Sequence, residues 1–266
     1  MGEVEPLGHW SRDCPLCGRD NRALAEGEFS TVGWILKTCE RCAMVYVESG
    51  DARRPPPGRE ASRFTRLRLR FALRKDFPTL VEVWAKPGAV LDMACGDGTR
   101  WDELSPAFVP FGIEADAERA AMAHGRFAAR GGTCLNASLF GGLTAFVDRT
   151  CTAVVMRSCL AREMDPLAVL REAHRVLQPG GVVLVKTPNF ASLNRLALGR
   201  RWCGLRPYEH LNHFTPATLR KMAEKAGFRA HYGLTYTLPT SDSMYVVLKK
   251  EGGESRAPRS CGGGCC

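Results

Sequence analysis

Apolar residues in the second two thirds of the chain form two kinds of pattern that alternate along the sequence. Short continuous apolar runs indicate buried strands, and apolar residues at every third or fourth position indicate a helix with one buried face. The continuous runs lie at 89–94, 109–114, 132–137, 151–158, 182–187 and 244–250. The helical runs lie at 99–105, 116–130, 165–181 and 214–228. Strands that alternate with helices predict an α/β fold with a mostly parallel, doubly wound, Rossmann-like sheet.

Capping residues mark the ends of some of these helices. Thr215 is suited to the N-cap position, Pro216 follows in the first turn, and Gly227 comes directly after the last helical residue. The run at 99–105 is expected to be a helix that ends near Pro106. These signals predict where individual helices begin and end.

The amino-terminal part of the chain has a different pattern, with two Cys-x-x-Cys pairs. Cys14 and Cys17 form the first pair, Cys39 and Cys42 form the second, and 21 residues separate them. Two such knuckles can complete a tetrahedral shell of four sulfurs around zinc, and a closed shell of this kind is structural because it leaves no position for a substrate. Free thiols are the alternative interpretation.

The composition between and after the cysteine pairs suggests the domain boundaries. Alternating residues at 29–38 and 44–48 predict a β-ribbon. We therefore expect a zinc-ribbon-like segment at 1–50, a Pro/Arg linker at 51–63, the α/β domain at 64–250, and a disordered Cys/Gly tail at 251–266 that holds Cys261, Cys265 and Cys266.

The net charge of +9 is concentrated in one segment. Residues 53–75 contain nine basic side chains and one acidic side chain, so this segment alone contributes +8. It could contact phosphate or a membrane surface. However, Phe64, Leu67 and Phe71 have helical spacing, which favours a solvated helix that packs one face on the domain. No apolar run is long enough to span a membrane and no signal peptide is evident, so we expect a cytoplasmic protein.

A glycine-rich turn follows the run at 89–94. Gly96 and Gly98 permit a tight turn whose backbone can approach a ligand beyond the carboxyl ends of the strands. Glu114 ends the next strand, where a carboxylate can accept hydrogen bonds from the two hydroxyls of a ribose. These features predict a site for a cofactor that contains adenosine.

Charge at the turn distinguishes among the adenosine cofactors. A carboxylate such as Asp92 or Asp97 disfavours a pyrophosphate and favours a cation, and S-adenosylmethionine carries an ammonium and a sulfonium group. The third glycine of a nicotinamide-binding turn is absent, since the residue after Gly-Asp-Gly-Thr is polar. No Gly-Lys-Ser/Thr sequence follows, so a phosphate-binding loop is disfavoured as well.

Four ordered motifs, VLDMACGDG, GIEAD, REAHRVLQPGGVVLVKTPN and EHLNHFTPATLRKMAEKAGF, resemble those of class I S-adenosylmethionine-dependent methyltransferases. The resemblance covers about residues 85–250 and is to the small-molecule branch that includes ubiquinone-biosynthesis and sugar methyltransferases. It implies a seven-stranded sheet whose last strand is antiparallel, and it implies that the segment after Val155 lies beside the methionine part of the cofactor. The cofactor contacts that it implies are Asp92, Ala94, Gly96, Gly98 and Glu114, with Asn136 or Ala137 beside the adenine.

The chain departs from its relatives at two places. Ala161 and Arg162 occupy positions where relatives often have Glu-His, so a general base cannot be transferred from there. Asn136 replaces the acidic residue that many relatives have after the third strand.

Methyl transfer needs a base only when the acceptor must lose a proton. His210 and His213 are the candidates, because they precede a helix that in relatives lies over the substrate cleft. Capping or packing in a loop is the alternative role for both. By the same analogy, Trp202, Tyr208 and Glu209 are candidates for the lining of this pocket. Cys95 is interpreted as a small apolar filler.

The sequence therefore predicts a methyltransferase that uses S-adenosylmethionine, carries structural zinc, and acts on a small molecule such as a sugar nucleotide or a secondary metabolite. Two alternatives stay open. One is an RNA methyltransferase that grips RNA with the ribbon and the arginine-rich helix, and the other is a non-catalytic zinc-ribbon adaptor. The acceptor, the atom that is methylated and the oligomeric state do not follow from the sequence.

Overall fold

The computed structural model of the protein describes residues 9–51, 77–232 and 241–251. Several sequence predictions lie outside these residues: the basic helix with Phe64, Leu67 and Phe71, all but the first residue of the linker, and all but the first residue of the Cys/Gly tail. In the described ranges, no helix combines the length and the apolarity that a membrane span requires.

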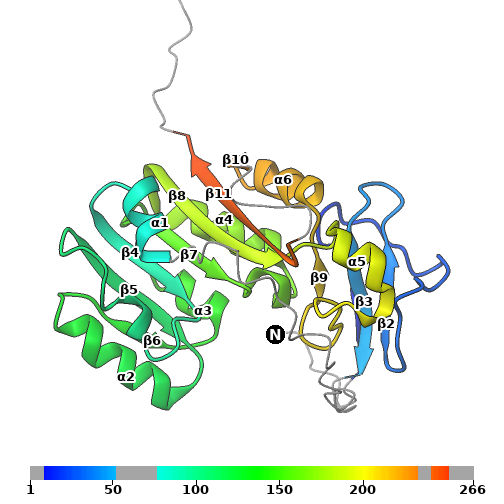
Figure 1. Ribbon diagram of the computed structural model, residues 1–266, viewed down its shortest axis with the longest axis horizontal. Coiled ribbons are helices and arrows are strands. Elements are labelled where there is room, and N and C mark those ends of the chain that lie inside the picture. The colour runs from blue at the N-terminus through cyan, green and yellow to red at the C-terminus, as the bar shows by residue number, and fades with distance from the viewer. Residues whose placement is uncertain (1–8, 52–76, 233–240, 252–266) are drawn as a thin grey trace, which may run out of the picture.

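A seven-stranded sheet forms the centre of the larger part of the molecule (Figure 1), with the strand order β10-β11-β8-β7-β4-β5-β6. Its strands are β4 (Gly88–Met93), β5 (Phe108–Glu114), β6 (Cys134–Asn136), β7 (Cys151–Arg157), β8 (Leu177–Pro188), β10 (Phe228–His231) and β11 (Ser243–Lys250). Neighbours from β6 to β8 are parallel, and β11 runs antiparallel to both β8 and β10. The predicted fold class is confirmed, including the antiparallel last strand.

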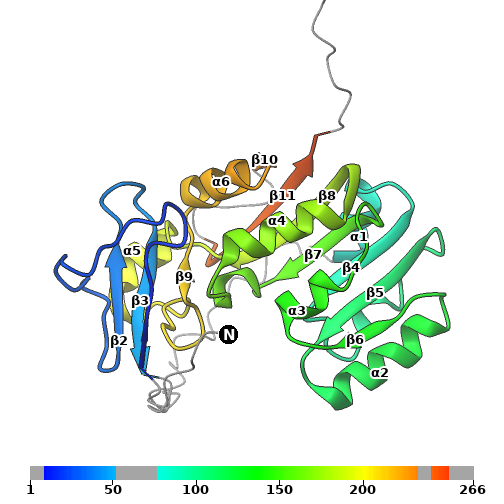
Figure 2. The same ribbon diagram turned by 180° about the vertical axis from the view of Figure 1, so that it is seen from behind.

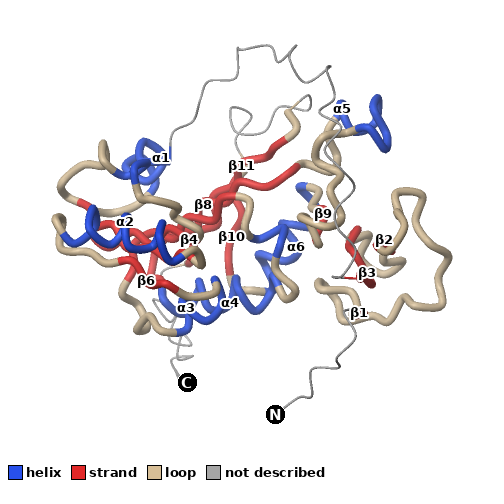
Figure 3. Tube along the Cα trace, turned by 90° about the horizontal axis from the view of Figure 1, so that it is seen from below, coloured by secondary structure: helices blue, strands red, loops and turns tan. Residues whose placement is uncertain are grey.

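Helices cover both faces of this sheet. Figure 3 shows α1 (Phe77–Trp84) and α2 (Ala117–Ala128) on one face, and α3 (Leu139–Thr144) and α4 (Pro166–Val176) on the other. The buried apolar residues divide in the same way, because Val90, Val155 and Leu184 pack with α1, whereas Leu91, Val154 and Val185 pack with α4 and α6 (Pro216–Lys225). Alternate residues of each strand thus supply two cores, as expected for a sheet that is buried on both sides.

The predicted caps of α6 are present. The Thr215 side chain accepts a hydrogen bond from the backbone N–H of Thr218, the Thr218 hydroxyl lies 3.0 Å from the backbone nitrogen of Thr215, and Pro216 occupies the first turn. Gly227 follows the helix with a φ of 87°, a left-handed conformation that glycine adopts without strain.

The prediction of a helix at 99–105 is wrong. Only a short 3₁₀ turn, η2 (Thr99–Trp101), forms there. The Arg130 guanidinium donates hydrogen bonds of 2.8–3.1 Å to the backbone carbonyls of Trp101, Leu104, Ser105 and Phe108. A distant side chain therefore satisfies backbone carbonyls at and beyond the end of this segment, and a local sequence pattern does not contain this information.

A second, smaller sheet lies beside the larger one (Figures 1 and 2). It contains β1 (His9–Ser11), β2 (Trp34–Thr38) and β3 (Val45–Asp51), and β1 and β2 both pair antiparallel with β3. Its fourth strand, β9 (Asn212–His213), comes from the segment between α5 (Leu193–Leu198) and α6 and pairs with Val45 and Tyr46 of β3. The amino-terminal ribbon and the larger part of the molecule thus share one sheet.

Candidate active site and metal centre

The glycine-rich turn between β4 and η2 has an unusual backbone. Ala94, Gly96 and Gly98 all have positive φ angles of 64°, 66° and 79°. A Cβ atom added at Gly96 would meet nothing within 4 Å, so this backbone faces open space where a ligand can approach it. A Cβ added at Gly98 would lie 3.0 Å from Phe127 and 3.2 Å from the Cα of Ala123, so this glycine allows α2 to pack closely on the turn. Gly98 therefore performs the packing role of the third glycine that appeared to be missing from the sequence.

Asp92 lies in β4 just before this turn and is 0% exposed. Its Oδ2 accepts hydrogen bonds of 2.8 Å from Nη1 of Arg100 and from Nε1 of Trp101, whereas its Oδ1 is buried without a partner. Burial raises the pKa of Asp92 to about 6, against the opposing effects of Arg100 and Trp101. A buried acceptor oxygen without a partner is unfavourable, so a ligand that donates an N–H here would be stabilising.

Glu114, at the carboxyl end of β5, holds the turn from the other side. Its Oε2 accepts a 2.9 Å hydrogen bond from the backbone N–H of Gly96, and its Oε1 accepts one of 3.1 Å from the N–H of Asp116. Arg119 forms an ion pair with Glu114, with its Nη2 3.2 Å from Oε1. The structure thus brings together Asp92, Gly96 and Glu114, which the sequence analysis had proposed as one site.

Asn136 ends the neighbouring strand β6. Its side-chain Nδ2 donates hydrogen bonds of 3.0 Å to the carbonyl oxygens of Glu114 and Ala115, so it ties the ends of β5 and β6 together.

Asp97, in the glycine-rich turn, is only half-buried. Its Oδ1 accepts a 2.8 Å hydrogen bond from the Thr99 hydroxyl, which lowers the pKa of Asp97.

Cys95 lies in the turn itself, and its side chain is buried. Its Sγ lies 3.5 Å from Sγ of Cys134, and both sulfurs occupy the space over Gly112, where a Cβ would lie 2.6 Å from Sγ of Cys95. Both cysteines are buried, in agreement with the interpretation of Cys95 as a filler.

His210 is buried, with 8% of its surface exposed. Its Nδ1 lies 3.2 Å from the carbonyl oxygen of Gly204. A carbonyl can only accept, so Nδ1 carries the proton in the neutral ring and Nε2 keeps a lone pair. Burial lowers the pKa of His210, which keeps the ring neutral at pH 7.

His213 lies on β9 and contacts the residues that follow β8. Its ring centroid is 5.3 Å from that of Phe190. The ring of Trp202 also packs against Phe190, with the two centroids 6.1 Å apart. Its Nε2 is buried without a partner, and burial lowers its pKa to about 3. Such a ring is neutral at pH 7 but accepts a proton weakly.

The other predicted pocket residues have structural partners. Nε1 of Trp202 donates a 2.7 Å hydrogen bond to Asp242, which precedes β11. Glu209 forms an ion pair of 3.0 Å with Arg206, and Tyr208 packs against the apolar core of the ribbon. In the loop after β7, Ala161 is fully buried and Arg162 is exposed.

Arg12 connects the ribbon with this loop, and the sequence analysis missed it. Its guanidinium donates to the carbonyls of Val47, Met164 and Leu211 at 2.6–2.8 Å and to Oδ1 of Asn212 at 3.1 Å. In turn, Nδ2 of Asn212 donates to the carbonyl of Glu163 at 2.7 Å. No local motif marks Arg12, since its partners lie up to 200 residues away.

The four knuckle cysteines converge on one point. Their sulfur atoms all lie within 4.8 Å of one another, and the Cys14–Cys42 and Cys17–Cys39 distances are both 3.5 Å. Four sulfurs at 2.3 Å from a tetrahedral zinc lie about 3.8 Å apart, so this arrangement fits the ion without rearrangement of the chain. The distances are too long for disulfide bonds.

The knuckles pack on the larger part of the molecule. Cys14, Cys39 and Cys42 belong to the same buried cluster as Leu219 and Met222 of α6. The Lys225 ammonium donates a 2.8 Å hydrogen bond to the carbonyl of Leu16, between the first two cysteines. The four-cysteine cluster is therefore part of the core and not an independent appendage.

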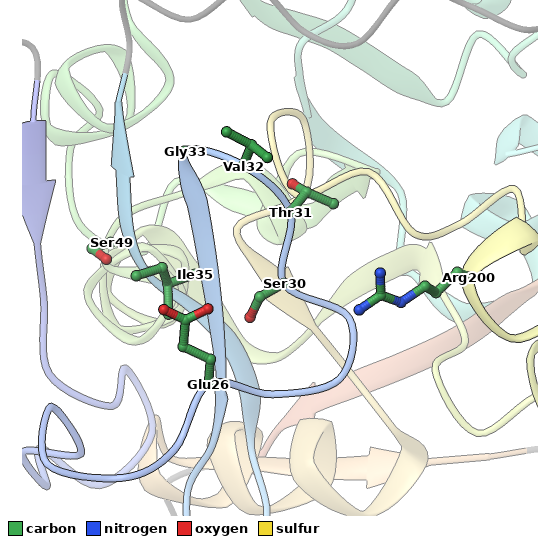
Figure 4. A pocket seen from close by; sticks show the side chains of 8 residues that line it. All are labelled: Glu26, Ser30, Thr31, Val32, Gly33, Ile35, Ser49 and Arg200. Atoms are coloured by element: carbon green, nitrogen blue, oxygen red, sulfur yellow. The ribbon is translucent and has the colours of Figure 1, made fainter.

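A hollow of about 600 Å³ lies on the ribbon (Figure 4). Figure 4 shows Glu26, Ser30 and Thr31 of the ribbon around it, with Arg200 of η4 (Gly199–Arg201) pointing in from the other side. Arg200 also donates a hydrogen bond to the carbonyl of Glu28. None of the predicted site residues lines this hollow.

Comparison with known proteins gives the family. A profile described as "Methyltransferase domain" matches residues 62–232. An uncharacterized protein of Mycobacterium tuberculosis and its counterpart in Mycobacterium bovis are 34% identical over 155 residues, which cover 56% of this chain and 49% of theirs. The chain thus spans about half the length of the curated relatives it matches.

Solved structures show the same fold. An S-adenosylmethionine-dependent methyltransferase of Thermotoga maritima, described as a possible histamine N-methyltransferase, superposes with a TM-score of 0.50 at 18% identity over 66% of this chain and 88% of its own. A putative O-methyltransferase of Nostoc punctiforme has a TM-score of 0.50 at 19% identity over 65% of this chain and 55% of its own.

The fold is that of the S-adenosylmethionine-dependent methyltransferases. This chain belongs to the methyltransferase domain family. The residues present at the turn fit the cofactor, because Oδ1 of Asp92 lacks a hydrogen-bond donor and the backbone at Gly96 faces open space.

Proposed function

We propose that the protein transfers the methyl group of S-adenosylmethionine to a small-molecule acceptor. The bound cofactor supplies a methyl group that is already activated on a sulfonium. The observation that carries the proposal is the unpartnered, buried Oδ1 of Asp92 beside an open glycine turn. In this proposal Asp92 receives the ammonium group, and Glu114 receives the ribose hydroxyls, as in the resembling enzymes.

Besides Asp92 and Glu114, the chain orients the cofactor mainly through backbone groups. Because Gly96 has no side chain, the main-chain amides of the turn can approach the cofactor closely. Ala94 and Gly98 hold the turn in its left-handed conformation. Asn136 fixes the end of β6, beside the expected position of the adenine. Transfer is an in-line displacement that gains chiefly from holding the two reactants close, aligned and away from water.

His210 is the proposed base for acceptors that must lose a proton. Its hydrogen bond with the Gly204 carbonyl selects the tautomer with a lone pair on Nε2, and its lowered pKa keeps that lone pair available at pH 7. His213 is also a proposed site residue. Because its pKa is about 3, we assign the proton transfer to His210 and the shaping of the pocket to His213.

The four cysteines are proposed to hold a structural zinc ion. The ion would fix the ribbon, and the ribbon fixes the histidine segment through the pairing of β3 with β9. Arg12 and Asn212 extend this support to the loop after β7. The ribbon thus has a role in building the active site, which favours a small acceptor over an RNA that would need a projecting surface.

The test uses methyl-tritiated S-adenosylmethionine and a cell extract divided into an ultrafiltrate and an RNA fraction. The proposal predicts that tritium enters the ultrafiltrate, and that His210→Asn slows this labelling. An Asp92→Ala variant is the control for labelling that does not depend on the site. Labelling of the RNA fraction, or of neither fraction, would contradict the small-molecule proposal.

A further inference from the structure

Two cations lie side by side at the carboxyl edge of the large sheet. Arg157 is the last residue of β7, and its register partner on β8 is Lys186. Arg157 is exposed and Lys186 is half-buried. Among the residues that the structure describes, neither cation forms an ion pair with a carboxylate. The Lys186 ammonium lies over the ring of Tyr245, with Nζ 5.2 Å from the ring centroid.

These side chains share the face of the sheet that holds Asp92. Val155 and Leu184, two residues before the two cations, pack with α1 on this face, and residues two apart on a strand point the same way. Tyr245, the register partner of Lys186 on β11, also packs on this face, 6.0 Å from Phe77 of α1. Arg157, Lys186 and Tyr245 therefore form one row across β7, β8 and β11, and Asp92 lies two residues further back on β4, in register with Val155.

The row has an excess of positive charge. Asp92 forms its ion pair with Arg100 at 2.8 Å and acts on Arg157 as a neighbouring charge, so among the described residues no carboxylate forms an ion pair with Arg157 or Lys186. Like charges directly opposite each other on neighbouring strands are destabilising, so the chain retains an unfavourable pair here. An anion between the two strands would remove this repulsion.

From this arrangement we infer that Arg157 and Lys186 bind an anionic group, a carboxylate or a phosphate, of the methyl acceptor. The inference rests on the proposed function and adds the chemical class of the acceptor. β8 is two strands from β4, about 10 Å away, on the side opposite β5 and Glu114. This side remains for the acceptor if the adenosyl group lies toward Glu114.

The carboxylate of the cofactor itself is the other possible source of the anion, and the experiment separates the two sources. The purified protein is titrated calorimetrically with inorganic phosphate at low salt, both free and saturated with S-adenosylhomocysteine. The variants are Arg157→Gln and Lys186→Gln. Lys221→Gln, which removes a charge from an exposed position of α6, is the matched control.

We expect phosphate to bind the wild type and the Lys221→Gln control equally. Each of the other two variants should weaken phosphate binding by about tenfold, because a hydrogen bond to a charged group is lost. Affinity for S-adenosylhomocysteine should stay within about twofold of the wild type in all variants. Phosphate binding that is absent from the wild type, or equal in all variants, would overturn the inference.

A second arm compares S-adenosylhomocysteine with 5′-methylthioadenosine, which lacks the carboxylate. If either variant weakened binding of the former but not of the latter, the cations would hold the cofactor and the inference would be wrong. Failure of the proposed function looks different, since the wild type would then bind no S-adenosylhomocysteine. The phosphate titration of the free protein still decides whether these two cations bind an anion.

Discussion

Asp92 and Trp101 are joined by a 2.8 Å hydrogen bond from the indole Nε1 to Oδ2, and Oδ1 of the same carboxylate is buried without a partner. The indole is itself 1% exposed, so the interaction fixes one side of the carboxylate inside the core. Oδ1 is thereby left without a hydrogen-bond donor on the residue that lies two positions before the start of the glycine turn. The first prediction follows from the unusual ionisation of this group.

Stability should depend on pH through Asp92. Its folded-state pKa of about 6 lies above the ordinary value of 3.8 for an aspartate, so the folded state holds the proton more tightly and the unfolding free energy falls as pH rises from about 4 to about 6. The shift corresponds to about 3 kcal/mol, as an order of magnitude. Asp92→Asn should lack this fall, and urea unfolding at a series of pH values measures it.

Asp97→Asn is the matched control for this measurement. Asp97 is half-buried and its pKa is lowered by its hydrogen bond with Thr99, so its replacement should not remove the fall between pH 4 and 6. If the stability curves of Asp92→Asn and the wild type ran parallel over this range, the buried carboxylate would not ionise as described.

Two glycines near α2 should respond in opposite ways to alanine. A Cβ at Gly132 would lie 1.8 Å from the backbone oxygen of Pro110, so Gly132→Ala must displace β5 and should destabilise the protein by about 2 kcal/mol or more. Gly125, inside α2, has nothing within 4 Å, and Gly125→Ala should stabilise by about 0.5–1 kcal/mol. Thermal unfolding of both variants checks this, and equal shifts would contradict the packing described.

Removal of the metal should disturb more than the ribbon. Cys39→Ser breaks the sulfur shell, and because Cys39 packs in the same core as α6, we expect a loss of several kcal/mol in stability. Zinc content by atomic absorption should fall from one ion per chain to about none. Cys203→Ser changes an exposed cysteine and is the control. A zinc content that is unchanged in Cys39→Ser would disprove the four-cysteine site.

His210→Asn should lower kcat while changing the affinity for the cofactor by less than about twofold, because His210 is proposed to act on the acceptor. A loss of about 10²–10⁴ is typical when a general base is removed. His213→Asn should act mainly on KM and stability. Equal losses of kcat in both variants, or full activity of His210→Asn, would contradict the assignment of the base.

Much of the fold could be predicted because local patterns carried it. The run at 89–94 and the Thr215 cap are determined by neighbours in sequence, and both occur as expected. The run at 99–105 forms only a 3₁₀ turn, and its carbonyls at Trp101 and Leu104 accept hydrogen bonds from Arg130, far along the chain. Local periodicity cannot contain such an interaction.

The site could be predicted only in part. Asp92, Gly96 and Glu114 lie at or just after the carboxyl ends of β4 and β5, which are neighbours, so sequence order was enough to bring them together. The role of β9 could not be foreseen, because Asn212 and His213 pair with a strand that lies more than 150 residues earlier. Arg12 and the facing pair of Arg157 and Lys186 also depend on register, which a single sequence leaves open.

Cofactor binding tests the central claim most directly. Calorimetric titration with S-adenosylmethionine should show one site per chain in the wild type, and binding should be lost in both Asp92→Ala and Glu114→Ala while far-UV circular dichroism shows that the two variants remain folded. NADH should not bind. Binding of NADH, absence of S-adenosylmethionine binding in the wild type, or retention of it in both variants would contradict the account.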